Sequence, residues 1–193
     1  MHRSFSMTCI GLLFLMAGCI PSLHPLYTEQ DLIFDPALVG QWAEKDSKES
    51  WTFTKSGEKE YKLLYVDGDG KKGEFVVHLL TFNEQRFLDL FPEDPGLEQN
   101  SFYKLHLLPV HTFLRLKEIE PALQMDVLKP DWLEKILAAD AGALRHEKMD
   151  GSILLTAQPK ELQAFLLKHA QTAEAWSECG PLTRQGQAEK AKE

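Results

Sequence analysis

Ser50-Trp51-Thr52-Phe53-Thr54 and Tyr61-Lys62-Leu63-Leu64-Tyr65-Val66 are the two stretches that say most about the fold. In the first, the aromatic side chains alternate with hydroxyl side chains. In the second, the first, third and fifth residues are apolar and share one side. A period of two places such side chains on one face of an extended strand. Both stretches therefore predict β-strands, each with one apolar face.

Short segments of the same kind continue along the chain. Asp67-Gly68-Asp69-Gly70 predicts a hairpin turn. The strand expected after it, residues 74–82, has apolar side chains on both faces. Further strands are expected over residues 86–91, 102–108, 112–117 and 123–128. Together with a segment near Trp42 they make about eight short strands at intervals of ~8–12 residues, which is typical of an antiparallel sandwich or barrel.

The apolar pattern changes period near residue 130. Residues 130–139 and 159–170 each begin with proline and place their apolar residues at helical spacing, so both predict helices. Residues 152–156 predict one more strand between them. The expected fold is α+β and predominantly antiparallel β: a small barrel or strongly curved sheet of about 8–9 strands with two helices near the C-terminus.

Gly40-Gln41-Trp42 resembles the Gly-x-Trp signature that opens the first strand of lipocalins and related small barrels. The resemblance implies a glycine that lets the chain turn tightly and a tryptophan that closes the barrel floor. Lipocalins also carry a Thr-Asp-Tyr turn and a late arginine that packs on the tryptophan. Neither is evident here, and Arg115 is the candidate counterpart of that arginine. Without the resemblance, Trp42 is interpreted as an ordinary core aromatic residue.

The first nineteen residues predict export and lipidation. A basic start at His2 and Arg3 precedes an apolar run of the length of a signal peptide, too short for a comfortable membrane span of ~20 residues. Met16-Ala17-Gly18-Cys19 then resembles the bacterial lipobox, with methionine at the usual leucine position. The resemblance implies cleavage before Cys19, acylation of that cysteine and, because Ile20 follows, the periplasmic face of the outer membrane.

These features divide the chain into four parts. Residues 1–18 form the signal peptide, and 19–36 a lipidated segment whose apolar side chains dock onto the domain. Residues 37–182 form one β-rich domain. Residues 183–193 are polar and are expected to be a disordered tail.

Composition excludes several classes of protein. The formal net charge is −8, and −9 once Arg3 leaves with the signal, so nucleic acid is an unfavourable partner. Lipidation of Cys19 leaves only Cys179 in the mature chain, so no intramolecular disulfide is expected. Neither a cofactor fingerprint nor a catalytic motif is found, and the expectation is a protein that is not an enzyme and has no cofactor.

A few polar side chains can be interpreted either as parts of a binding site or as structural groups. His106 and His111 flank a bend and could form a two-histidine metal site with Glu118 or Asp126, but structural histidines are the favoured interpretation. Arg115 at an inner barrel mouth could hold a ligand carboxylate, whereas the simpler interpretation is a solvated face.

Two functions remain open at this stage. In the first, a lipid-anchored barrel binds a small apolar or amphipathic ligand between aromatic walls. In the second, a filled domain is a structural or interaction lipoprotein that docks to another envelope component, such as an envelope protein. The two differ in whether the barrel is hollow. The residues that would line either the cavity or the core are Trp42, Trp51, Phe53, Tyr61, Tyr65 and Arg115.

Overall fold

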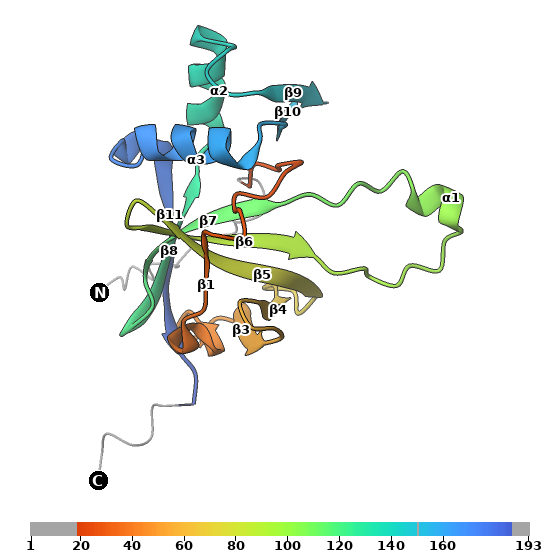
Figure 1. Ribbon diagram of the computed structural model, residues 1–193. Helices are drawn as coiled ribbons and strands as arrows, with labels where there is room; N and C mark the ends of the chain where they lie inside the picture. The colour runs from red at the N-terminus through yellow and green to blue at the C-terminus, as the bar shows by residue number, and fades with distance from the viewer. Residues whose placement is uncertain (1–18, 150, 187–193) are drawn as a thin grey trace, which may run out of the picture.

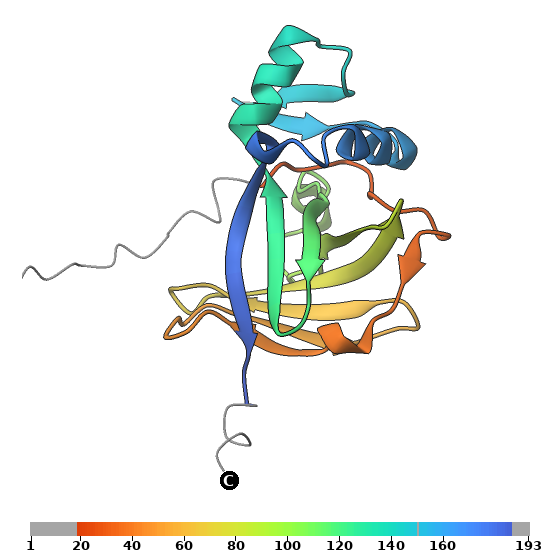
Figure 2. The same ribbon diagram turned by 90° about the vertical axis from the view of Figure 1, so that its left-hand side faces the viewer.

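A computed structural model describes residues 19–149 and 151–186 of the chain, so the predicted signal peptide lies outside the described residues. The centre is a closed, eight-stranded antiparallel barrel, confirming the lipocalin-like fold (Figures 1 and 2). Each strand pairs with the next along the chain, and the last pairs with the first. The strands are β2 (Gly40–Ala43), β3 (Ser50–Lys55), β4 (Tyr61–Val66), β5 (Lys72–Phe82), β6 (Gln85–Pro92), β7 (Thr112–Glu118), β8 (Ala122–Leu128) and β11 (Trp176–Arg184).

Alternation decides which side chains enter the barrel. Trp51 pairs with Tyr65 and Phe53 with Leu63 across β3 and β4. Residues that pair across two strands point to the same face of the sheet, so the apolar residues of neighbouring strands meet inside the barrel. The long β5 is apolar on both faces because its inner face lines the barrel and its outer face carries Leu80 into a second core.

The closing strand β11 is absent from the sequence-based expectation. Its pairing with β8 shifts register between Cys179 and Leu182, around Gly180-Pro181. The buried positions are therefore three residues apart, at Trp176, Cys179 and Leu182, instead of two. A bulge of this kind hides the strand pattern. β11 also extends to Arg184, two residues into the stretch expected to be a tail.

Residues 129–175 connect β8 to β11 and form a separate layer against the barrel (Figures 1 and 2). Both predicted helices are present, each with proline in its first turn, and Gln158 and Glu161 form a capping box on the second. The layer consists of α2 (Pro130–Ala139), β9 (His146–Met149), β10 (Ser152–Leu155), α3 (Pro159–Lys168) and the 3₁₀ turn η2 (Ala173–Ala175).

The segment that follows Cys19 is built into the fold. Ser22 exchanges two backbone hydrogen bonds with His111, of 2.9 and 2.8 Å, and Leu23 N donates to Leu155 O of β10. β1 (Leu32–Ile33) pairs with β5, and the 3₁₀ turn η1 (Pro36–Leu38) leads into β2. Leu26 is fully buried. The chain between Cys19 and the barrel is therefore packed, as its apolar content predicts.

The described residues form two apolar cores. One fills the barrel, and the other lies between the outer barrel wall, the N-terminal segment and the layer of residues 129–175. Arg115 crosses the second interface, where its Nη1 donates to Ala170 O at 2.7 Å just beyond α3. The barrel and its covering layer thus share one buried boundary.

The predicted strand at 102–108 is wrong. The chain there leaves the barrel between β6 and β7 as a long arm, which contains the short helix α1 (Ser101–Lys104). Asn100 caps α1 by accepting a hydrogen bond from Tyr103 N. The apolar residues suggested a strand, but no neighbouring strand supplies hydrogen bonds.

Among the described residues, no helix is long and apolar enough to cross a membrane.

Candidate functional site

The barrel interior is the first place where a lipocalin-like fold could hold a ligand, and here it is filled. Trp42, Phe53, Tyr61 and Leu63 have no exposed surface, and Trp51 is only 9% exposed. They form one continuous cluster with apolar side chains from the opposite wall. The apolar cleft beside Cys19 and the groove beside Arg115, which are described below, both lie outside the barrel interior. Trp42, Trp51, Phe53 and Tyr61 therefore lie in the core.

The two tyrosines named among the candidate cavity-lining residues both contact other groups of the protein. The Tyr61 hydroxyl accepts a hydrogen bond from Asp35 N at 2.6 Å and donates one to Asp35 O at 3.0 Å. Burial raises the pKa of Tyr61. Tyr65 packs edge-on against Trp51, with ring centroids 5.0 Å apart, and burial followed by the nearby Glu49 carboxylate raises its pKa. Neither phenol is available as a free ligand-binding group.

The arginine that packs on Trp42 is Arg184, at the end of β11. Its guanidinium carbon lies 4.2 Å from the centroid of the Trp42 ring. It also donates hydrogen bonds to the carbonyl oxygens of Ala37 and Val39. Gly40 has φ +142°, and a Cβ on it would overlap Arg184 Nη1. The glycine, tryptophan and arginine thus form one unit that closes the barrel.

Arg115 has a different role from the three considered in the sequence analysis. It lies on the outer wall, where its guanidinium carbon is 4.0 Å from the centroid of Trp176, not of Trp42. Its Nε and Nη2 donate to Asp126 Oδ2, the former at 3.0 Å. Arg115 is therefore not the arginine that packs on Trp42, and it does not lie at an inner mouth of the barrel. The solvated face is also wrong, because only 15% of the Arg115 side chain is exposed. A planar guanidinium that pairs with a carboxylate and stacks on an indole serves here to fix the covering layer.

A polar surface groove of about 630 Å³ lies beside this arginine. Asp126 is 1% exposed, and its Oδ1 lies 3.7 Å from Lys117 Nζ without a hydrogen-bond partner among the described residues. Lys117 instead pairs with Glu178 at 2.9 Å. Arg115 and Lys117 thus each pair with a carboxylate that also lines the groove, Asp126 and Glu178 respectively. These pairs link β7 to the neighbouring strand β8 and to β11.

The two-histidine hypothesis is wrong. His106 lies on the arm, where its Nδ1 is 2.8 Å from Phe102 O. His111 Nδ1 is 2.6 Å from Asp89 Oδ1, and Asp89 Oδ2 accepts a hydrogen bond from Leu26 N. This pair therefore holds the N-terminal segment. In the described part of the chain, no group of three or more His, Cys, Asp or Glu side chains is placed to hold a metal ion.

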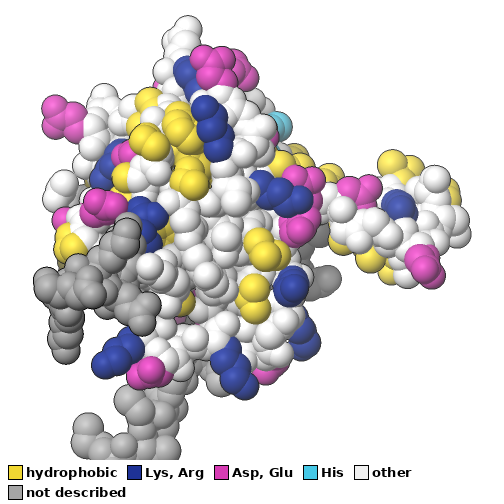
Figure 3. Space-filling view, turned by 90° about the horizontal axis from the view of Figure 1, so that it is seen from below, with side chains coloured by type: hydrophobic (Ala, Val, Ile, Leu, Met, Phe, Trp, Pro, Cys, Tyr) yellow, Lys and Arg dark blue, Asp and Glu magenta, His cyan; other side chains and the backbone are white. Residues whose placement is uncertain are grey.

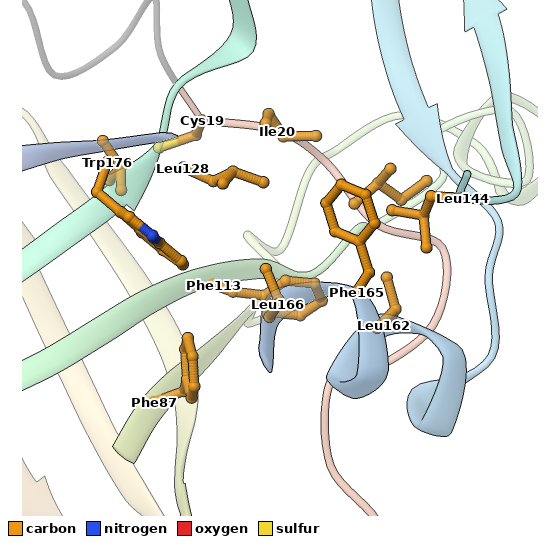
Figure 4. Close-up of a pocket in the computed structure, with 12 residues that line it drawn as sticks. Cys19, Ile20, Phe87, Phe113, Leu128, Leu144, Leu162, Phe165, Leu166 and Trp176 are labelled. Carbon is orange, nitrogen blue, oxygen red and sulfur yellow. The ribbon is translucent and has the colours of Figure 1, made fainter. Parts of the chain in front are cut away.

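Cys19 and Cys179 occupy different settings. Cys179 is buried, and that burial raises its pKa to about 12, so its thiol is protonated and unreactive at neutral pH. Cys19 is exposed and borders an apolar cleft outside the barrel, together with Ile20, Phe165 and other apolar residues (Figure 4). The space in this cleft is about 20 Å³. That is room for about one water molecule, so the cleft as it stands does not accommodate a lipid.

The most unusual surface belongs to the apolar arm, defined as residues 93–111. It projects from the body, with apolar side chains gathered along it (Figures 1 and 3). Of the seven large hydrophobic side chains that are exposed among the described residues, only Leu23 lies elsewhere. The six on the arm are Leu97, Phe102, Tyr103, Leu105, Leu107 and Leu108. Exposed apolar side chains gathered on one element in this way mark interaction sites.

No protein-family model, curated protein or solved structure matches this chain. The described residues themselves therefore carry the information on function. They combine a barrel without an internal cavity, polar groups engaged in structural pairs, and one exposed apolar arm.

Proposed function

We propose that this chain is a lipid-anchored, non-catalytic interaction protein of the bacterial envelope. The filled barrel is a rigid scaffold, and the apolar arm is the element that docks to another envelope component. The supporting observation is the contrast between Phe53 and Phe102. Phe53 in the barrel is fully buried, whereas Phe102 on the arm is 76% exposed. Removing a phenyl ring from water is favourable, so the exposed ring of Phe102 is the one that would gain from contact with a partner.

The anchor is the second part of the proposal. The lipobox at residues 16–19 supports acylation of Cys19, and Ile20 directly after it is only 9% exposed. The expected anchor is therefore attached to the folded body without a flexible linker. The filled interior makes a ligand carrier the less supported alternative, since a carrier needs internal volume.

Photo-crosslinking in cells tests the docking role. A photoreactive amino acid replaces Leu105 in the full-length chain, and in a matched control it replaces Asp69, an exposed residue of the β4–β5 turn. Docking through the arm predicts adducts from position 105 and none from position 69. The absence of any adduct from position 105, in protein shown to be exported and folded, would reject the arm as a docking element.

Acylation is tested separately. Mass spectrometry of the mature N-terminus should find acyl chains on Cys19, and Cys19→Ala should leave an exported precursor that carries none. Labelled palmitate that still enters the Cys19→Ala protein would refute the anchor while leaving the arm hypothesis untouched.

A further inference from the structure

We infer that the component to which the arm docks is the lipid bilayer itself: the tip of the arm, residues 100–108, enters the interfacial region of the membrane. This inference depends on the proposed docking role and names its partner. It makes the arm a second attachment point beside the acylated Cys19.

The apolar side chains of the tip do not form a single face. Phe102, Tyr103 and Leu105 are 76%, 53% and 78% exposed. Consecutive residues of a helix are about 100° apart, so the two aromatic residues within α1 project in different directions. A peptide that binds in a protein groove places its anchors on one side, with spacing of three or four residues. A tip that is apolar on several sides is better covered by a surrounding medium than by a groove.

Charge along the arm favours the same partner. The carboxylates of the arm, Glu93, Asp94 and Glu98, precede the tip, and the chain has no further carboxylate until Glu118. Within the tip, the only basic side chains are those of Lys104 and His106. Carboxylates are costly to bring into an apolar medium, whereas a lysine can extend its ammonium group to the headgroups. Aromatic residues beside leucines are typical of segments that lie in the membrane interface.

The base of the arm is adjacent to the proposed anchor. His111, the last residue of the arm, exchanges two backbone hydrogen bonds with Ser22, which is three residues from Cys19. Because Ile20 and Ser22 are buried, this connection is rigid. An acyl chain on Cys19 would therefore hold the base of the arm close to the bilayer surface, where the effective concentration of lipid is high.

Depth-dependent fluorescence tests the inference with the mature, lipidated protein. Leu105→Cys is labelled with an environment-sensitive dye, and Asp69→Cys is the matched control. Acylation blocks Cys19, and burial protects Cys179 from labelling. Each protein is reconstituted into vesicles of phosphatidylethanolamine and phosphatidylglycerol whose acyl chains are brominated. Mass spectrometry of Cys19 before reconstitution establishes that the anchor is present.

Insertion predicts that the dye at position 105 shifts to shorter wavelength and loses emission to the brominated chains, while the dye at position 69 does neither. Replacing Phe102 and Leu107 by serine in the labelled Leu105→Cys protein should reverse both changes. If the dye at position 105 behaves like the one at position 69, the bilayer is not the partner. Protein adducts at position 105 would then preserve the docking role, and a lack of all adducts would remove that role too.

Discussion

The Arg184 guanidinium carbon lies 4.2 Å from the centroid of the Trp42 indole, and Arg184 Nη1 donates to Val39 O at 2.6 Å. One arginine thus connects the end of the last barrel strand to the start of the first. Trp42 is fully buried, and its Nε1 donates to Leu38 O at 2.9 Å. A cation over an aromatic ring and hydrogen bonds to the carbonyl groups of Ala37 and Val39 both stabilise this closure.

Gly40→Ala should destabilise the fold by about 1–3 kcal/mol, because the new methyl group meets Arg184 and φ +142° is unfavourable for alanine. Urea unfolding measures the change. Gly180→Ala is the matched control, since a Cβ there meets no atom within 4 Å. In an Arg184→Ala background the cost of Gly40→Ala should fall, because only the backbone strain remains. Equal costs in both backgrounds would exclude the proposed clash.

Trp42→Ala should cost about 3–5 kcal/mol, as other large-to-small changes in a core do. Trp42→Phe should cost less, because it keeps an aromatic face for Arg184 and loses mainly volume and the hydrogen bond to Leu38. The midpoint of urea unfolding is the measurement. An alanine variant with an unchanged midpoint would contradict the buried position of this indole.

Arg115→Met should destabilise the protein by about 3–5 kcal/mol, because it leaves the buried Asp126 carboxylate without its main partner. Lys117→Met, at a position whose side chain is 40% exposed, should cost less than about 1 kcal/mol. Combining Arg115→Met with Asp126→Leu should recover much of the lost stability. A single Arg115→Met variant as stable as the parent would show that Arg115 does not fix the covering layer.

Asp31 makes the free energy of unfolding depend on pH in acidic solution. Burial by itself would raise its pKa, but hydrogen bonds from Thr28 and Gln163 and the charge of Lys160 outweigh it and lower the pKa from 3.8 to about 2. The unfolded chain therefore binds more protons between these values, so stability is present above pH 3.8 and is lost as pH falls towards 2.

Asp31→Asn should remove this part of the pH dependence. Urea midpoints of the parent protein should fall between pH 4 and pH 2 by more than those of the variant. Asp69→Asn is the control, because the Asp69 side chain is 79% exposed. Parallel midpoints for parent and Asp31→Asn over this range would show that the Asp31 network does not contribute.

A fluorescent fatty acid should not show saturable binding to the barrel. Trp51 lies within the filled core, so its emission, followed in a variant without the other tryptophans, should not change on titration. Saturable binding by the parent that competes with unlabelled lipid would restore the carrier hypothesis.

Local patterns were sufficient for most of the architecture. The alternation at Trp51 and Phe53 and the proline-led starts at Pro130 and Pro159 depend on residues close in sequence. The strands β2 to β8 and both helices of the covering layer were predictable for this reason. The Gly-x-Trp resemblance also placed Trp42 correctly at the opening of the first barrel strand.

Only the tertiary structure decided the rest. The bulge at Gly180-Pro181 hid β11, and with it the partner of Trp42, because that contact joins residues 142 positions apart. Residues 102–108 are as apolar as a strand, but a strand also needs a neighbour to pair its backbone, and none is within reach. Whether the barrel is hollow depends on how side chains from eight strands fill one volume, which no local pattern encodes.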